Sequence, residues 1–207
     1  LTETMKVARE LAPGGYFDFR DGAYTYVLPE YDCTDWTFYG SCCTPNVCWR
    51  KSWHAVEAKD VSRLPGARLY VGDEAVLFVV GDRRVRLELA YAEPLFQARR
   101  GGAYYLVFMD NTLSRPGSPM AQCGAGTEQS VVWFKLSTAL LEERRQDVLI
   151  DSCWYVVNED HRVDAGGISG EADRVDFNTG EQTGRVAYHY DHRRPQRGLN
   201  IKELPAH

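Results

Sequence analysis

The stretch between residues 68 and 109 constrains the fold more than any other part of the chain. It contains an apolar run, Ala75–Val80, which is rich in β-branched residues and typical of a strand buried on both faces. Gly81-Asp82 follows, and residues 83–91 then alternate between charged and apolar side chains. This pattern predicts a tight β-hairpin whose second strand is half exposed. We expect a third apolar run, Tyr104–Met109, to pair beside the hairpin and complete the centre of the core.

Turn-forming residues recur along the rest of the chain at intervals of about ten residues, which is typical of a β-sandwich or barrel. Each interval holds a short apolar or alternating run. We interpret residues 94–100 and 158–170 as connections, and residues 139–146 as either a helical turn or a long hairpin turn. The other expected strands cover residues 16–19, 23–28, 130–136, 147–157, 173–177, 185–190 and 199–202.

The chain is therefore expected to form one β-rich domain over residues 1–207, an antiparallel β-sandwich or open barrel. A short helical arm is predicted at residues 1–13. Thr2 can cap this helix, Val7 and Leu11 lie on one face, and a Pro-Gly-Gly sequence ends it.

Six cysteines indicate a disulfide-stapled fold in an oxidising compartment. We expect Cys123 to pair with Cys153 and the other four to pair locally within a cysteine- and aromatic-rich loop segment at residues 31–54. Zinc binding by that segment with His54 is the alternative, but the spacing matches no paired CxxC motif, so no metal site is predicted. The cysteines concerned are Cys33, Cys42, Cys43, Cys48, Cys123 and Cys153.

Charge and hydropathy exclude several classes of protein. The net charge of −5 disfavours nucleic acid as a partner, since such proteins usually present a basic face. The longest apolar run has seven residues, too few to span a membrane. The chain begins at Leu1, so we expect a mature or trimmed product from which a signal peptide has been removed. The cysteines favour a location in the periplasm or outside the cell.

Catalytic motifs are few. His189 and Asp191 alternate on one expected strand and could act as a base and its orienting group, but the sequence supplies no third group, so we favour a structural role. His192 stands beside Arg193, Arg194 and Arg197, which resembles a solvated basic edge. No GxSxG, SxxK or phosphate-loop motif occurs, and no cofactor is predicted. A solvated loop is favoured over a calcium site for the acidic residues Asp160, Asp164, Glu171, Asp173 and Asp176.

Aromatic side chains crowd the cysteine-rich segment. Rigid aromatics on a disulfide-held loop make good recognition surfaces, because they bury much area at little entropic cost. They can equally cover a small core around the disulfides. The candidate partner-binding residues are Trp36, Phe38, Tyr39, Trp49 and Trp53.

These observations favour a non-enzymatic extracytoplasmic binding protein, of the inhibitor or immunity type, that binds a partner protein. The net negative charge of the chain would complement a basic partner. One alternative is a small secreted hydrolase or carbohydrate-active protein that uses His189 and Asp191 or a pair of carboxylates. A third is a structural subunit of an envelope assembly.

Overall fold

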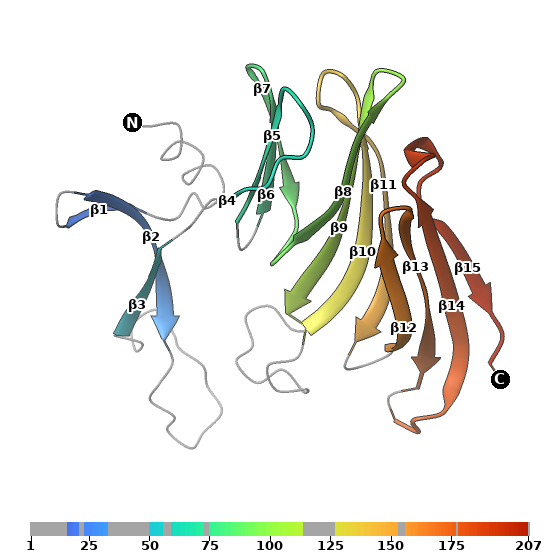
Figure 1. Cartoon of the computed structure of the whole chain (residues 1–207). Coiled ribbons are helices and arrows are strands. Elements are labelled where there is room, and N and C mark those ends of the chain that lie inside the picture. Colours follow the sequence, from blue (N-terminus) through green and yellow to red (C-terminus); the bar gives the residue numbers. More distant parts are fainter. Residues whose placement is uncertain are drawn as a thin grey trace.

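The chain forms three antiparallel β-sheets in the computed structural model (Figure 1), which confirms the expected mostly-β class. The predicted helical arm at residues 1–13 lies outside the described residues. Among those that are described, the helical element is a 3-10 turn, η1 (Pro195–Arg197). No described helix has the length and apolar character needed to cross a membrane. The structure describes residues 16–20, 23–32, 50–55, 59–72, 75–113, 127–152, 156–176 and 178–206.

The first sheet has three strands in the order β1-β2-β3 and lies to one side of the other two in Figure 1. Its strands are β1 (Tyr16–Arg20), β2 (Ala23–Asp32) and β3 (Arg50–Ala55). The expected hairpin of residues 16–19 and 23–28 is confirmed, since Arg20 pairs with Ala23. The second strand continues beyond Pro29, which pairs with Trp53 of β3.

The second sheet has four strands in the order β4-β5-β6-β7. They are β4 (Lys59–Asp60), β5 (Ala67–Val71), β6 (Ala75–Val80) and β7 (Arg83–Glu88). The predicted hairpin is confirmed: Val80 pairs with Arg83, and Gly81 between them has a φ of 61°, which suits glycine. The first four residues of β6 are buried, whereas β7 is mostly exposed, as expected.

The third sheet has eight strands that follow one another as a meander from β8 to β15. It corrects one expectation, because the run Tyr104–Met109 forms part of β9 in this sheet and does not pair beside β6 and β7. The strands are β8 (Glu93–Arg100), β9 (Ala103–Leu113), β10 (Thr127–Leu136), β11 (Glu142–Ser152), β12 (Val156–Asp164), β13 (Gly167–Val175), β14 (Gln182–Asp191) and β15 (Asn200–Leu204).

Both faces of β9 are apolar, which explains its central position between two core clusters. One face, with Leu106 and Phe108, packs against Leu69 and Phe78 of the four-stranded sheet. The opposite face, with Val107, belongs to a second cluster inside the curl of the eight-stranded sheet. A strand that is apolar on both sides gains most when both sides are covered, so it belongs in the middle layer.

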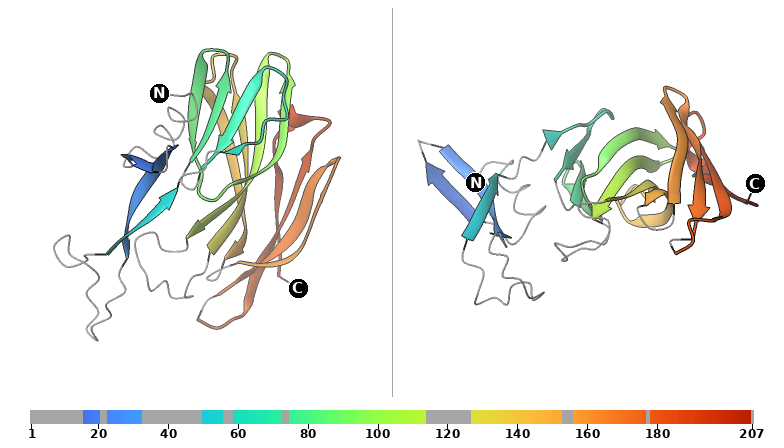
Figure 2. Two further views of the ribbon diagram at one scale, coloured as in Figure 1. Left: turned by 60° about the vertical axis from the view of Figure 1, so that its left-hand side comes forward. Right: turned by 90° about the horizontal axis from the view of Figure 1, so that it is seen from below.

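The eight-stranded sheet curls so that its first strand approaches β14 (Figure 2). Phe96 of β8 and Tyr190 of β14 have ring centroids 5.4 Å apart, and both side chains belong to the inner cluster. Each strand pairs with the next along several residues, except that β11 and β12 pair through Ser152 and Val156 alone among the described residues. The eight-stranded sheet therefore curls around the inner cluster, with β8 and β15 as its outermost strands.

Two segments interpreted as connections are strands. Residues 94–100 lie in β8, and residues 158–170 form most of the β12–β13 hairpin. The second segment lacks a recognisable apolar face because its exposed side chains, from His161 to Asp164, line a strand with little cover. Of the alternatives for residues 139–146, the hairpin turn is the better description, although β11 already begins at Glu142.

Candidate functional site

One end of the curled sheet carries a concentration of positive charge. The β8–β9 turn, the β10–β11 turn and the segment that follows β14 all lie at this end, which is uppermost in Figure 1. Several exposed arginines project from two of these segments, although the whole chain has a net charge of −5. We call the group the arginine-rich end, and it consists of Arg99, Arg100, Arg193, Arg194 and Arg197.

The segment after β14 is shaped by its first residues. The carboxylate Oδ1 of Asp191 accepts the backbone N–H of Arg193 at 2.9 Å, and the backbone N–H of Arg194 donates to the carbonyl of Asp191 at 3.0 Å. Aspartate commonly organises a turn in this way. Pro195 then begins η1, where its fixed φ suits a helical first position.

Two side chains of the core anchor this segment. Trp133 donates its indole Nε1–H to the carbonyl of Pro195 at 3.1 Å. Gln146 accepts the N–H of Leu199 at 3.1 Å and donates to the carbonyl of the same residue at 3.2 Å. Gly198 has a φ of 73°, and a Cβ placed there would displace the Gln146 side chain, so any other residue would be strained and would break its hydrogen bonds to Leu199.

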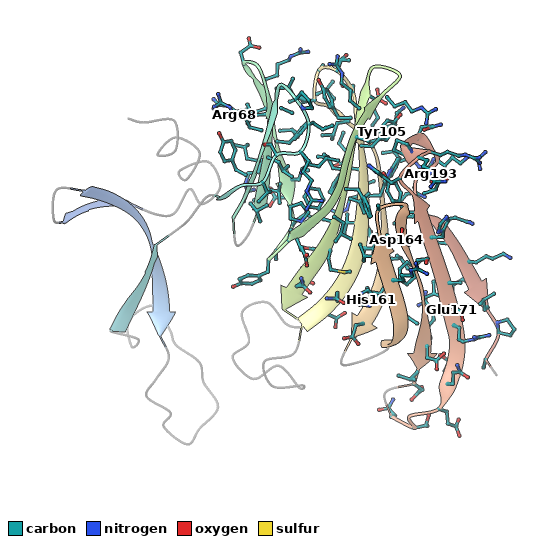
Figure 3. All side chains as sticks on the ribbon, viewed as in Figure 1. Arg68, Tyr105, His161, Asp164, Glu171 and Arg193 are labelled. Carbon is teal, nitrogen blue, oxygen red and sulfur yellow. The ribbon has the colours of Figure 1, made fainter. Side chains whose placement is uncertain are left out.

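Arg100 joins the β8–β9 turn to the same segment, because its Nη1 donates to the carbonyl of Arg193 at 2.5 Å. The guanidinium of Arg99 lies 5.4 Å from the ring centroid of Tyr104, within cation–π range. Figure 3 shows Arg193 beyond the end of β14. Within the described part of the chain, neither Arg193 nor Arg197 forms a side-chain ion pair.

A guanidinium is planar and always charged, and it can bind a carboxylate, phosphate or sulfate group through two parallel hydrogen bonds. The backbone beneath Arg193 and Arg197 is fixed by the Trp133, Gln146 and Arg100 hydrogen bonds. A positioned backbone lowers the entropic cost of binding. The arginine-rich end therefore has the chemistry and the support of an anion-binding surface.

His192 begins the segment and faces the core. Its ring packs against Phe96, with centroids 5.0 Å apart, and lies 6.2 Å from the ring of Tyr190. The Nδ1 atom is buried and has no hydrogen-bond partner in the part of the chain that the structure describes. Burial lowers the pKa of His192, and the neighbouring Asp191 carboxylate partly opposes this effect.

His189 and Asp191 lie on one face of β14, as their alternation predicts. His189 is exposed and pairs across the sheet with Ser169 and Asn200. The Asp191 carboxylate is directed to its own turn and lies 3.8 Å from the Nε of Arg194. The described hydrogen bonds include none between His189 and Asp191, so the geometry gives no support to a base and its orienting group.

The predicted aromatic surface and the cysteines fall largely outside the described residues. Trp53 lies on β3, whereas Trp36, Phe38, Tyr39 and Trp49 lie outside. All six cysteines, including the expected Cys123–Cys153 pair, also lie outside, so their pairing stays a prediction. His54 of the alternative zinc site is on β3.

The acidic residues weighed as calcium ligands are distributed over strands and a turn. Glu171 pairs with Arg185 at 2.8 Å, and Asp173 accepts from Gln182 at 2.5 Å. The Asp176 carboxylate accepts two backbone N–H groups of the β13–β14 turn. Among the described residues, no group of three or more His, Cys, Asp or Glu side chains could hold a metal ion.

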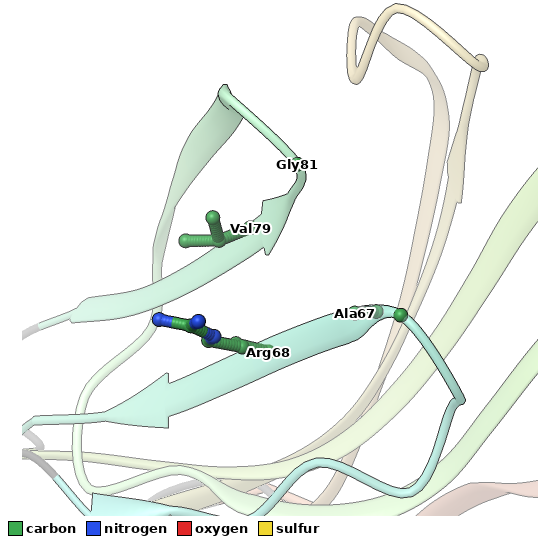
Figure 4. A pocket seen from close by; sticks show the side chains of 5 residues that line it. Ala67, Arg68, Val79 and Gly81 are labelled. Carbon is green, nitrogen blue, oxygen red and sulfur yellow. The ribbon is translucent and has the colours of Figure 1, made fainter.

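A shallow hollow of about 670 Å³ lies at the turn end of β5 and β6 (Figure 4). Its lining includes Arg68 and Val79, which pair across the two strands, and the turn residues Gly66 and Gly81. A Cβ at either glycine would meet nothing within 4 Å. The hollow is therefore an open depression above a single guanidinium, and it places fewer charges together than the arginine-rich end does.

The sequence contains part of the signal for this end. Arg193, Arg194 and Arg197 are recognisable as a basic edge, but Arg99 and Arg100 are more than ninety residues away in the chain. Comparisons of the chain with family models, with curated proteins and with solved structures gave no match.

Proposed function

We propose that this chain is a non-enzymatic extracytoplasmic binding protein whose arginine-rich end binds an acidic segment of a partner protein, in the manner of an inhibitor or immunity-type protein. The observation that carries the proposal is the anchoring of Arg193 and Arg197 on a segment held by Gln146 and Trp133. Arginine is enriched among the residues that dominate protein interfaces, where its planar fork recognises carboxylates bidentately.

The local charge argues for an acidic partner rather than the basic one that the net charge suggested. Five arginines stand at one end, and Asp191 is the acidic residue of the segment after β14. The remainder of the chain is more acidic than its net charge of −5, because these arginines contribute five positive charges to that sum. A long polyanion would run over this acidic remainder and be repelled, whereas a short acidic segment would contact the arginines alone.

The extracytoplasmic location rests on the six cysteines, since structural disulfides persist in oxidising compartments. Titration of the denatured, unreduced protein with a thiol reagent should find few or no free thiols. Six free thiols together with bound zinc would overturn the location and the disulfide framework.

The experiment is affinity capture from envelope and culture-fluid extracts of the source organism, compared between wild type and the double variant Arg193→Glu/Arg197→Glu. A photo-crosslinking residue at the exposed position of Gln196 identifies what contacts this end, and one at Thr183 on β14 is the positional control. We expect one stoichiometric protein, crosslinked from Gln196 and absent with the double variant. The purified partner should then bind wild type and lose roughly tenfold or more in affinity for the variant.

The matched control is Arg162→Glu/Lys202→Glu, which makes the same change of charge at two exposed residues of other strands. It should leave binding almost unchanged. Equal loss with both double variants would mean that net charge, rather than this end, governs binding. Capture that survives Arg193→Glu/Arg197→Glu would overturn the site, and a partner found only as a glycan or nucleic acid would overturn the partner class.

A further inference from the structure

The strand β7 forms an open edge of the four-stranded sheet. Within the described residues it pairs with β6 alone, and it is the last strand in the order β4-β5-β6-β7 (Figure 1). Arg84, Arg86 and Glu88 are all exposed, and Arg86 forms an ion pair with Glu88 along the strand, which an added strand would share or replace. This edge belongs to a different sheet from the arginine-rich end, so a role for the edge is independent of the proposed function.

The register of the hairpin decides which backbone groups face outward. Val80 and Arg83 flank a two-residue turn, and such a flanking pair is hydrogen-bonded across the two strands. Backbone groups then alternate along β7, so those of Arg83, Val85 and Leu87 point to β6. The N–H and C=O groups of Arg84, Arg86 and Glu88 consequently point away from the sheet, where a further strand would pair with them.

The side chains of β7 give the two faces of this edge different chemistry. Arg84, Arg86 and Glu88 share the outer face, since they pair across the sheet with Val79, Leu77 and Ala75. Leu87 is buried in the core against the eight-stranded sheet, and Val85 is half-buried against the same cluster. An added strand would therefore place alternate residues beside two arginines and one glutamate, and the residues between them over the rim of the core.

We infer that the open edge of β7 accepts an extended segment of a partner protein as an added strand, with acidic residues opposite Arg84 and Arg86, a basic residue opposite Glu88, and apolar residues between them. Main-chain hydrogen bonds supply affinity in this mode of recognition, and the alternating side chains supply specificity. Opposite charges directly across two strands stabilise the pair.

The same charges disfavour a second copy of this chain as the occupant. Antiparallel pairing of two β7 strands centred on Val85 places Arg84 opposite Arg86 twice, and a register centred on Arg86 matches Arg84 with Glu88 but places Arg86 opposite itself. A register centred on Leu87 matches Arg86 with Glu88 but puts Arg84 opposite Ala90, beyond the partner's β7, so no register of a second copy matches all three charges. Like charges directly across a pair are destabilising, which is how arginine and lysine protect natural edge strands from self-association. An acidic strand meets no such penalty.

The test uses a synthetic acetylated and amidated peptide, Thr-Lys-Val-Glu-Val-Glu-Thr, and fluorescence anisotropy with the full chain. In the antiparallel register its lysine faces Glu88 and its glutamates face Arg86 and Arg84. N-methylation of the glutamate opposite Arg86 removes an N–H that points to β7 and should weaken binding roughly tenfold or more. N-methylation of the valine next to it changes an N–H that points away, so it should have little effect.

Two variants of Arg86 separate the contribution of its side-chain charge to binding from that of its backbone N–H. Arg86→Thr keeps the outward N–H and should weaken binding modestly, whereas Arg86→Pro also removes the N–H and should abolish it. Circular dichroism checks that each variant is folded. If Arg86→Pro does not fold, the two N-methylated peptides decide the question on the wild-type protein.

Three results would overturn the inference: equal binding of the two N-methylated peptides, equal binding of a charge-exchanged peptide Thr-Glu-Val-Lys-Val-Lys-Thr, or a wild-type dimer in sedimentation that Arg86→Pro dissociates. The last result would assign the edge to a second copy. None of them bears on the arginine-rich end, which the Arg193→Glu/Arg197→Glu variant tests separately.

Discussion

Gln146 on β11 holds Leu199 by both polar groups of its backbone. Its Oε1 accepts the N–H of Leu199 at 3.1 Å, and its Nε2 donates to the carbonyl of Leu199 at 3.2 Å. A primary amide can bind the N–H and the C=O of one residue in this way, because it offers a donor and an acceptor side by side. The segment that carries Arg193 and Arg197 is thereby fixed to a strand some fifty residues earlier in the chain.

Replacement of Gln146 by Leu should loosen this segment without disturbing the sheet. Two backbone groups of Leu199 lose their partners, so we expect the free energy of unfolding in urea to fall by about 1–3 kcal/mol. Arg193 and Arg197 would also become less well positioned, and affinity for the partner should fall with them. The second variant is Gln146→Glu, which still accepts the N–H of Leu199 but sets a carboxylate oxygen against the carbonyl of Leu199, so it should also be less stable than wild type. A Gln146→Leu protein as stable as wild type would show that the two Gln146–Leu199 hydrogen bonds do not stabilise the fold.

The β7–β8 connection has a comparable anchor in Asp110. Its Oδ1 accepts the N–H of Ala90 at 2.7 Å, and the side chain is 7% exposed. Asp110→Ala leaves a buried donor unpaired and should reduce the free energy of unfolding by about 1–3 kcal/mol. Asp110→Asn keeps an acceptor oxygen and should restore most of the loss in the same urea titration. Equal destabilisation by both variants would show that charge rather than hydrogen bonding matters here.

How much the sequence could predict depends on how local the signal is. The β6–β7 hairpin was predicted with its turn, because a glycine-containing turn and a period-two pattern act over neighbouring residues. The strand at residues 104–109 was also predicted, but its sheet was not. A strand that is apolar on both faces could be buried in either sheet. Which sheet it joins depends on packing against residues such as Phe78 and Phe134, which are not its neighbours in the sequence.

The arginine-rich end shows the same limit for function. Arg193, Arg194 and Arg197 are visible as a basic cluster in the sequence. Their support is not visible, because Trp133 and Gln146 are an ordinary core aromatic and a strand glutamine until the curl of the sheet brings η1 against them. Most of the β12 strand was missed for a related reason: its residues 161–164 are all exposed, and such a segment carries little apolar pattern to detect.

The lowered pKa of His192 predicts that the protein loses stability as the pH falls. Burial against Phe96 holds this pKa below its ordinary value of 6.5, so the unfolded chain binds a proton more readily than the folded protein does. The stability associated with His192 is therefore complete above pH 6.5 and is lost as the pH falls from there through the lower pKa of the folded state. Urea titrations between pH 7.5 and roughly 4.5 should show a steeper loss for wild type than for His192→Phe. Parallel curves would contradict a buried neutral imidazole.

Removal of the Tyr190 hydroxyl should not destabilise the protein, in contrast to the loss of the Gln146 or Asp110 side-chain hydrogen bonds. Its ring is fully buried, and its hydroxyl has no hydrogen-bond partner in the part of the chain that the structure describes. Burial and the neighbouring Asp191 raise the pKa of this hydroxyl well above its usual range, so it is neutral at physiological pH. An unpaired buried hydroxyl is costly, and Tyr190→Phe should therefore leave the free energy of unfolding unchanged or raise it by up to about 1 kcal/mol.

Trp133→Phe is the informative contrast to Tyr190→Phe, because it removes a polar atom that does have a partner. The indole of Trp133 donates to the carbonyl of Pro195, so loss of the donor leaves that oxygen with the longer 3.3 Å hydrogen bond from the N–H of Gly198, and the smaller ring leaves space in the core. Destabilisation by about 1–3 kcal/mol is expected in the same urea titration. If Tyr190→Phe were instead the more damaging change, the hydroxyl would have to bind a buried water or ligand within the curl, and the inner cluster would then be a binding cavity rather than a closed core.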